Sequence, residues 1–216
     1  MVDENLAQND IKALVTAIEQ DADNWRAYVD LVNVLAATEN LIEAEELALK
    51  SLNLFEQNDE AHEHLLYATG NVYYLAGDFN NANRFFKEVT NHHLQHDATM
   101  MQAQSWYNQK NFNQALVYGL TGVEQVPKDE AAQIMLGNIW LSLNDLEHAK
   151  GAFNQALVVN EKNFDANFGR GLIAAVEGQL ENEWLDNAKE INHEKYQQQA
   201  QQLDDLTQLL NGRIDE

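Results

Sequence analysis

A pattern of about 34 residues recurs along this 216-residue chain and limits its possible folds more than any other feature. Each copy is centred on an alanine, and these anchors are Ala44, Ala82, Ala115 and Ala149. A small residue or valine stands twelve positions before each anchor, and an aromatic residue or leucine stands nine before. The anchors are 38, 33 and 34 residues apart. A period of this length is typical of folds built from stacked repeats.

The residue types in the pattern predict a pair of antiparallel helices in each copy. Small residues at the anchor and twelve positions before it would let the two helices approach closely. Asparagine or aspartate stands four positions before each anchor, and we expect it to end the first helix and cap the second; these residues are Asn40, Asp78, Asn111 and Asp145. One pair cannot bury its own apolar face, so neighbouring pairs must stack.

This signature of small, aromatic and alanine positions resembles the tetratricopeptide repeat, and Pro127 matches the family's proline just past the second helix. The resemblance covers residues 25–190 and implies an all-α fold, a right-handed superhelical solenoid of antiparallel helix pairs with capping helices at both ends. We therefore predict a single domain over residues 1–216. It would comprise an N-terminal cap helix at 1–24, repeats at 25–58, 63–95, 96–129 and 130–163, a degenerate repeat at 164–192, and a C-terminal cap helix and tail at 193–216.

Three places depart from the pattern. Residues 59–62 are additional, and we expect them to lengthen a helix by about one turn. Gly119 and Gly122 replace larger residues in the third repeat, which indicates either close helix packing or a hinge. The fifth repeat has Glu183 in place of the anchor alanine, and its second helix is predicted to have an apolar stripe. This stripe consists of Leu180, Trp184, Ala188 and Ile191. A second apolar stripe is predicted on the C-terminal cap helix, and it consists of Tyr196, Ala200, Leu203, Leu206 and Leu210.

The resemblance also implies where a ligand would bind, because in this family the first helices line a concave groove. Their inward positions predict a peptide-binding groove of Asn33, Tyr67, Asn71, Tyr74, Met100, Gln104, Tyr107, Ile134, Asn138 and Leu141. Amide side chains recur at its middle position, and amides can satisfy the backbone of an extended peptide. The alternative is that they are solvated helix surface. These positions hold no lysine or arginine, so the carboxylate clamp of chaperone-binding members is not expected.

Charge and composition exclude several classes of function. The 35 acidic and 13 basic residues give a formal net charge of -22, which repels phosphate backbones and anionic lipids. We expect no nucleic-acid or membrane partner, and a polar or basic protein partner instead. No apolar run approaches the ~20 residues of a membrane span. The acidic N-terminus does not look like a secretory signal, so a cytoplasmic location is expected.

Candidate chemical sites are few. The chain has no cysteine, and five of its seven histidines surround the second repeat. Of these, His92 and His96 have the i, i+4 spacing of metal ligands, but solvated loop histidines are the favoured interpretation, and no metal or cofactor is expected. The carboxylates form no recognisable catalytic pair, and no nucleophile motif is present. The sequence thus predicts a non-catalytic adaptor that binds an extended segment of another protein; a self-assembling homo-oligomeric scaffold and a chaperone-like escort of a client protein are the alternatives.

Overall fold

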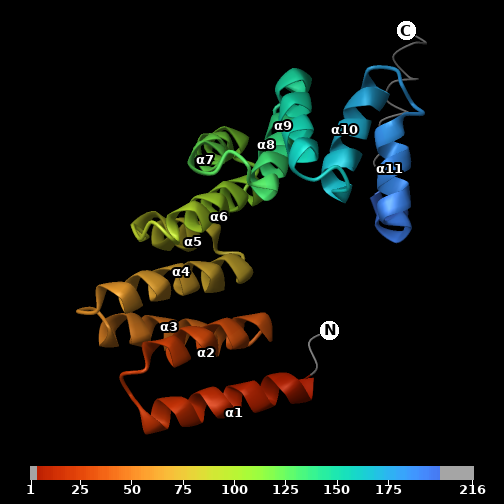
Figure 1. Ribbon diagram of the computed structural model, residues 1–216. Coiled ribbons are helices and arrows are strands. Elements are labelled where there is room, and N and C mark those ends of the chain that lie inside the picture. Colours follow the sequence, from red (N-terminus) through yellow and green to blue (C-terminus); the bar gives the residue numbers. More distant parts are fainter. Residues whose placement is uncertain (1–3, 200–216) are drawn as a thin grey trace. The chain divides into compact units, whose positions relative to one another are not determined.

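The computed structural model describes residues 4–199, with side chains described from residue 7 onward. Within this range the chain consists of helices and short connections without a strand, which confirms the predicted all-α fold class. The helices are α1 (Glu4–Gln20), α2 (Trp25–Ala37), α3 (Leu41–Leu54), α4 (Asp59–Leu75), α5 (Phe79–Glu88), α6 (Gln95–Asn108), α7 (Phe112–Gln125), α8 (Glu130–Ser142), α9 (Leu146–Val159), α10 (Phe164–Val176) and α11 (Glu183–Ile191) (Figure 1). Residues 193–199 are helical again.

The chain divides into two compact units, and the boundary lies between Asn111 and Phe112. Unit 1 contains α1 to α6, and unit 2 contains α7 to α11. The third predicted repeat is therefore divided, with its first helix in unit 1 and its second in unit 2. The single domain expected from the sequence stays a prediction.

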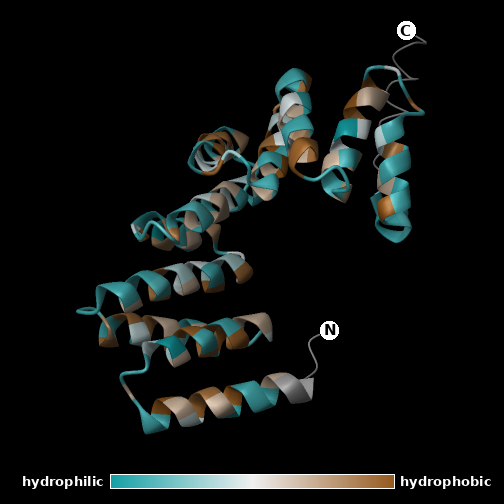
Figure 2. Ribbon diagram, in the orientation of Figure 1, coloured by the Kyte–Doolittle hydropathy of each residue, from teal (hydrophilic) through white to brown (hydrophobic). Residues whose placement is uncertain are grey.

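Within each unit the helices pack as the repeat pattern predicts. In unit 1, α2 pairs with α3 and α4 with α5, while α3 packs on α4 and α5 on α6. In unit 2, α8 pairs with α9 and α10 with α11, while α7 packs on α8 and α9 on α10 (Figure 1). Figure 2 shows hydrophobic and hydrophilic residues interspersed along most helices, as is expected of amphipathic helices that stack. The helix-pair solenoid is thus present in both units.

A single backbone feature marks the turn inside every repeat. The residue five positions before each anchor has a positive φ, between 59° and 78°. These residues are Glu39, Gly77, Lys110 and Asn144. The following aspartate caps the second helix in two repeats, where Asp78 and Asp145 accept hydrogen bonds from the backbone N–H of Asn81 and His148 at 3.1 Å. The cap predicted at Asn40 is wrong, because its side-chain amide instead donates to Thr38 Oγ1 at 3.0 Å.

Small residues bring the two helices of a repeat together as expected. All four anchor alanines are fully buried. A Cβ on Gly70 would lie 2.5 Å from the Phe86 ring, and one on Gly137 would lie 2.7 Å from the Phe153 ring. A side chain larger than glycine would collide with these phenylalanines, so in these two repeats the glycine twelve positions before the anchor sets the distance between the two helices.

Two of the departures from the pattern are explained. Helix α4 begins at Asp59 and has 17 residues, whereas α2 has 13, which confirms the extra turn. A Cβ on Gly119 would lie 2.9 Å from Cδ1 of Ile139 on α8. This contact lies inside unit 2 and supports close packing at Gly119 rather than a hinge.

The apolar stripe predicted for the fifth repeat is correct at Ala188 but wrong at Leu180 and Ile191. Gly178 has a φ of +95°, but α11 does not begin until Glu183, after a longer turn than in the other repeats. Asn182 caps α11 by accepting from the backbone N–H of Leu185 at 3.1 Å. The later start shifts the helix register, so Leu185 and Ala188 are buried while Leu180 is 52% and Ile191 38% exposed.

The C-terminal cap is described only at its beginning. The ring of Tyr196 meets the ring of Phe168 on α10 at a right-angled contact with centroids 6.0 Å apart. This contact agrees with the apolar side predicted for the cap. The other stripe residues, from Ala200 onward, lie outside the described range.

Candidate functional site

Seven of the ten predicted groove residues lie together in unit 1, on the first helices of successive repeats. We call this set the amide face; it consists of Asn33, Tyr67, Asn71, Tyr74, Met100, Gln104 and Tyr107. Asn33 is exposed and the other six are half-buried. The supporting helices are neighbours, since α2 packs on α4 and side chains link α4 to α6.

A chain of hydrogen bonds joins α6 to α4 across the amide face. Gln104 Nε2 donates to Asn108 Oδ1 at 3.2 Å, and Asn108 Nδ2 donates to the hydroxyl of Tyr74 at 3.0 Å. Asn108 was not among the predicted site residues. Its position four residues after Gln104 places both on one side of α6, and this spacing could have revealed it.

Two tyrosines of the amide face, Tyr67 and Tyr74, pack against phenylalanine rings of α5. The Tyr67 ring lies 5.7 Å from the Phe86 ring, and the Tyr74 ring lies 5.5 Å from that of Phe79, in both cases between centroids. Burial raises the pKa of Tyr67, and the nearby carboxylate of Asp97 on α6 raises it further, while a hydrogen bond with Asn71 lowers it. Asp97 is thus a further member of the site that the sequence did not predict, although it lies one turn before Met100.

The remaining three predicted residues lie in unit 2. Ile134, Asn138 and Leu141 are all on α8 and all half-buried. Asn138 holds the repeat position of Asn71 and Gln104, eleven before the anchor. The groove positions predicted from the repeat therefore carry side chains that are at least partly exposed in both units.

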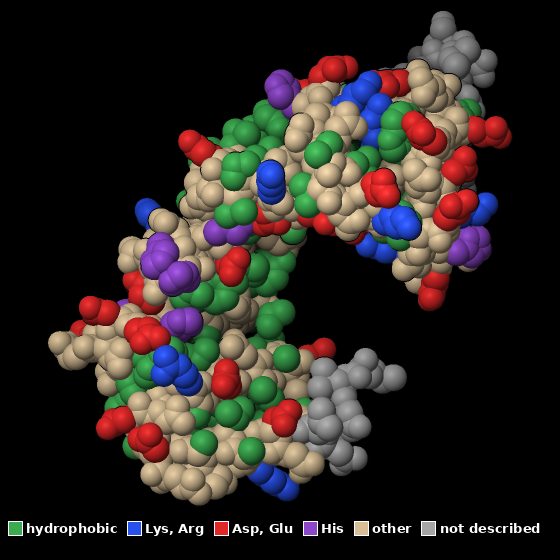
Figure 3. All heavy atoms as spheres, in the orientation of Figure 1, with side chains coloured by type: hydrophobic (Ala, Val, Ile, Leu, Met, Phe, Trp, Pro, Cys, Tyr) green, Lys and Arg blue, Asp and Glu red, His purple; other side chains and the backbone are tan. Residues whose placement is uncertain are grey.

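Acidic side chains outnumber basic ones on the visible surface (Figure 3). Figure 3 shows acidic side chains spread over the visible face and fewer lysine and arginine side chains between them. Arg26, on α2, pairs with Glu60 on α4 at 2.9 Å. The amide face itself contains no lysine or arginine.

The histidines of unit 1 form no complete metal site. The rings of His92 and His93 are 3.7 Å apart between centroids, and both residues are exposed. His96 is half-buried. Over residues 7–199, no group of three or more histidine, aspartate and glutamate side chains is placed to hold a metal ion. The i, i+4 pair of His92 and His96 thus lacks a third ligand there.

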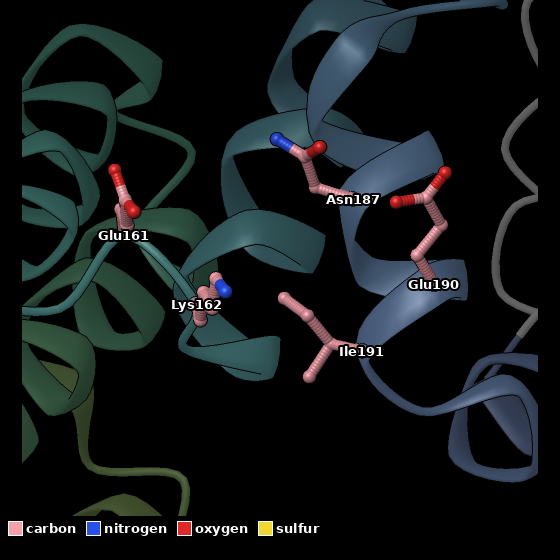
Figure 4. Close-up of a pocket in the computed structure, with 5 residues that line it drawn as sticks. All are labelled: Glu161, Lys162, Asn187, Glu190 and Ile191. Atoms are coloured by element: carbon pink, nitrogen blue, oxygen red, sulfur yellow. The ribbon is translucent and has the colours of Figure 1, made fainter.

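Unit 2 has a cavity of about 420 Å³ that the sequence did not indicate. It is lined by Glu161, Lys162, Asn187, Glu190 and Ile191 (Figure 4). Asn187 and Ile191 project from α11 toward the turn that carries Lys162 (Figure 4). Charges of both signs and one apolar side chain meet here, without a nucleophile beside a base.

In the part of the chain that the structure describes, every helix is too short or too polar to cross a bilayer.

Comparisons with known proteins agree with this architecture. A model of the tetratricopeptide repeat family matches residues 134–188. A search of curated protein sequences gave no match. Among solved structures, YrrB is 23% identical to this chain and is described as a tetratricopeptide-repeat protein with an unusual peptide-binding site. The alignment covers 84% of this chain and 93% of YrrB, with a TM-score of 0.61.

Two further structures have the same fold. MamA from Desulfovibrio magneticus is 18% identical, with 84% of this chain and 96% of that chain covered and a TM-score of 0.61. The first tetratricopeptide-repeat domain of Spaghetti (RPAP3), bound to an HSP90 peptide, is 19% identical, with 54% and 93% covered and a TM-score of 0.51. The recurring anchors, the stacked helix pairs and the family match over residues 134–188 together show that this chain has the fold of a tetratricopeptide-repeat solenoid.

Proposed function

We propose that this chain is a non-catalytic interaction module whose amide face binds an extended segment of another protein. The tetratricopeptide repeat is a fold of protein–protein interaction modules, and two of the similar structures are described with a peptide-binding site or a bound peptide. The residues of this chain itself give the more specific support.

The row of amides on successive helices is the observation that carries the proposal. Asn33, Asn71 and Gln104 stand on α2, α4 and α6 at the same repeat position. An extended peptide presents N–H and C=O groups at regular intervals, and each amide offers both donors and an acceptor to them.

The amide face is also organised before a ligand arrives. Gln104 is hydrogen-bonded to Asn108, so its side chain loses less freedom on binding than a free one would. The tyrosine rings beside the amides offer apolar contact with a polar tip. A polar or basic segment suits this surface, because it contains no cation and the chain as a whole is strongly acidic.

The proposal is tested by panning the full chain against a displayed library of random twelve-residue peptides. The variant Asn71→Ala/Gln104→Ala removes two amides of the face, and Asn53→Ala/Gln155→Ala removes two exposed amides from α3 and α9 as a matched control. We expect peptides that are enriched on the wild type and the control but not on the face variant, with helicity unchanged by circular dichroism. If all three proteins enrich the same peptides, binding takes place elsewhere and the proposal fails.

Self-association is the second candidate function, and one observation on α3 favours it. Ile42 is 80% and Leu49 36% exposed, and their i, i+7 spacing places them on one side of the helix. Light scattering on the wild type and on Ile42→Glu/Leu49→Glu tests this candidate. A dimer that the variant converts to a monomer would support it, and a monomeric wild type at high concentration would exclude it.

A further inference from the structure

Resting on the proposed function, we propose that the Tyr74 hydroxyl donates a hydrogen bond to one backbone carbonyl of the bound segment, and that Asn108 orients it for this role. Both residues lie in unit 1, Tyr74 on α4 and Asn108 at the end of α6. The amide row accounts for binding of a peptide backbone in general. This inference names the ligand group at one fixed point of the amide face.

The inference starts from the direction of the hydrogen bonds that cross from α6 to α4. Gln104 Nε2 donates to Asn108 Oδ1 at 3.2 Å, and Asn108 Nδ2 donates to the hydroxyl oxygen of Tyr74 at 3.0 Å. Each donation therefore runs towards Tyr74. Because the Tyr74 oxygen accepts in this chain, its own proton is left to be donated to another group.

The described part of the protein does not use that proton. Over residues 7–199, the bond from Asn108 is the only hydrogen bond of the Tyr74 hydroxyl. Tyr74 is half-buried on the amide face, so part of its side chain is accessible from outside. A ligand acceptor that binds on this face would complete the hydrogen bonding of the hydroxyl.

The Tyr74 hydroxyl is held in position before a ligand arrives. The Tyr74 ring makes an edge contact with the Phe79 ring, with centroids 5.5 Å apart, and Asn108 holds the hydroxyl end. Hydrogen bonds that run in one direction polarise each other, so donation by Asn108 makes the Tyr74 proton a stronger donor. A donor that is already oriented loses little freedom when it binds.

A backbone carbonyl is the acceptor that suits this donor best. Asn71 lies one turn before Tyr74 on α4, where its amide can pair with a neighbouring peptide group. A carboxylate would also accept, but the amide face has no lysine or arginine to balance it, and the chain has a net charge of -22. A neutral carbonyl avoids this repulsion.

A purely structural role for these hydrogen bonds makes a different prediction. In that case the bond between Asn108 and Tyr74 would only tie α6 to α4, and the direction of donation would not affect a ligand. Asn108→Asp separates the two roles, because a carboxylate accepts hydrogen bonds but cannot donate them. Tyr74 would then donate its proton to the new carboxylate. The tie between the helices stays, while the donor is withdrawn from the ligand.

The protein side is tested by fluorescence polarisation with a peptide that the library selection enriches on the wild type. The full-length variants are Tyr74→Phe, Asn108→Asp and the two combined. Tyr118→Phe and Asn53→Asp are the matched controls, because Tyr118 is half-buried on α7 and Asn53 is exposed near the end of α3.

We expect Tyr74→Phe and Asn108→Asp each to bind the peptide about three- to tenfold more weakly, the range for one hydrogen bond, and the controls to bind like wild type. In the Tyr74→Phe background, Asn108→Asp should add no further loss, because the donor is already absent. This comparison also measures any effect of the added charge alone. Circular dichroism and urea unfolding check that Asn108→Asp is folded and close to wild type in stability.

The ligand side is tested with copies of the peptide in which one backbone amide at a time is replaced by an ester, whose carbonyl is a weaker acceptor. We expect one position at which the ester weakens binding to the wild type but not to Tyr74→Phe. At that position Asn108→Asp should behave like Tyr74→Phe, although it retains the hydroxyl.

The outcomes separate this inference from the proposed function. If Tyr74→Phe binds like wild type, or if no ester position depends on Tyr74, the inference is overturned, while a loss of binding in Asn71→Ala/Gln104→Ala still supports the proposed function. If Asn108→Asp binds like wild type, or weakens binding equally with and without the Tyr74 hydroxyl, the orienting role of Asn108 is overturned. If no enriched peptide depends on the amides, both proposals fail.

Discussion

Phe86 lies so close to Gly70 that a Cβ on the glycine would stand 2.5 Å from its ring. The glycine is twelve residues before the anchor Ala82, and the phenylalanine is four residues after it. Gly137 and Phe153 repeat this relationship around Ala149 in unit 2, at 2.7 Å. The same contact thus sets the helix-to-helix distance in both units.

The first prediction concerns this contact. Gly137→Ala should lower the free energy of unfolding by about 1–3 kcal/mol, because the added methyl group forces the buried Phe153 ring to move. Gly151 on α9 is the matched control, since a Cβ there meets no atom within 4 Å. Gly151→Ala should raise the free energy of unfolding by up to ~1 kcal/mol, the difference between glycine and alanine in a helix. Urea unfolding measures both, and equal midpoints for Gly137→Ala and wild type would contradict the account.

The second prediction concerns Glu63, which ties α4 to the loop before α6. Its carboxylate accepts hydrogen bonds from the backbone N–H groups of Thr90 at 2.7 Å and Asn91 at 3.0 Å, and from the Thr90 hydroxyl. Partial burial alone would raise the pKa of Glu63, but these hydrogen bonds together outweigh it and lower the pKa below 4.5. A lowered pKa stabilises the fold above the unfolded-state value, and this stabilisation is lost as the pH falls through the folded-state value.

Glu63→Gln should therefore cost about 1 kcal/mol at pH 7, where the charged hydrogen bonds are intact. The difference from wild type should shrink as the pH falls below 4.5, because wild-type Glu63 becomes protonated. Urea unfolding at a series of pH values measures this. A difference that stays constant down to pH 3 would rule out the charged carboxylate as the cause.

The third prediction concerns Asn83 on α5, a buried residue whose two side-chain amide atoms have no hydrogen-bond partner among the residues that the structure describes. An unsatisfied buried amide is costly, so Asn83→Leu should raise the free energy of unfolding by about 1 kcal/mol. Asn80 on the same helix is exposed, and Asn80→Leu should change stability little. Calorimetry of both variants tests this, and a lower melting temperature for Asn83→Leu would contradict it.

Much of the fold follows from the sequence because the pattern repeats. The anchors predicted the helix pairs, and the extra residues before the second repeat predicted the longer α4. The turn inside each repeat needed the structure, since its positive-φ position is occupied by Glu39, Lys110 and Asn144 as well as by glycine. Because several residue types adopt the positive φ at this position, a single sequence does not reveal that the position requires it.

The errors lie where the pattern weakens. The fifth repeat keeps its turn at Gly178, but the lengthened connection moves the start of α11, and the predicted stripe follows the wrong register. Asn182 with Glu183 and Asp186 after it was the local signal of the true start. At the site, the repeat positions predicted the amides, and the i, i+4 spacing after Gln104 could have revealed Asn108. The influence of Asp97 on Tyr67 needed the three-dimensional arrangement, because the two residues are on different helices.

The central claim, that the repeated amides bind an extended peptide, is tested most directly by calorimetric titration of a peptide enriched on the wild type. The titration compares wild type, Asn71→Ala/Gln104→Ala, and the control Asn53→Ala/Gln155→Ala, whose amides are exposed on α3 and α9. We predict that the first variant binds at least about tenfold more weakly, because each lost amide leaves peptide groups unpaired, while the control binds like wild type. Equal affinity in all three folded proteins would contradict the claim.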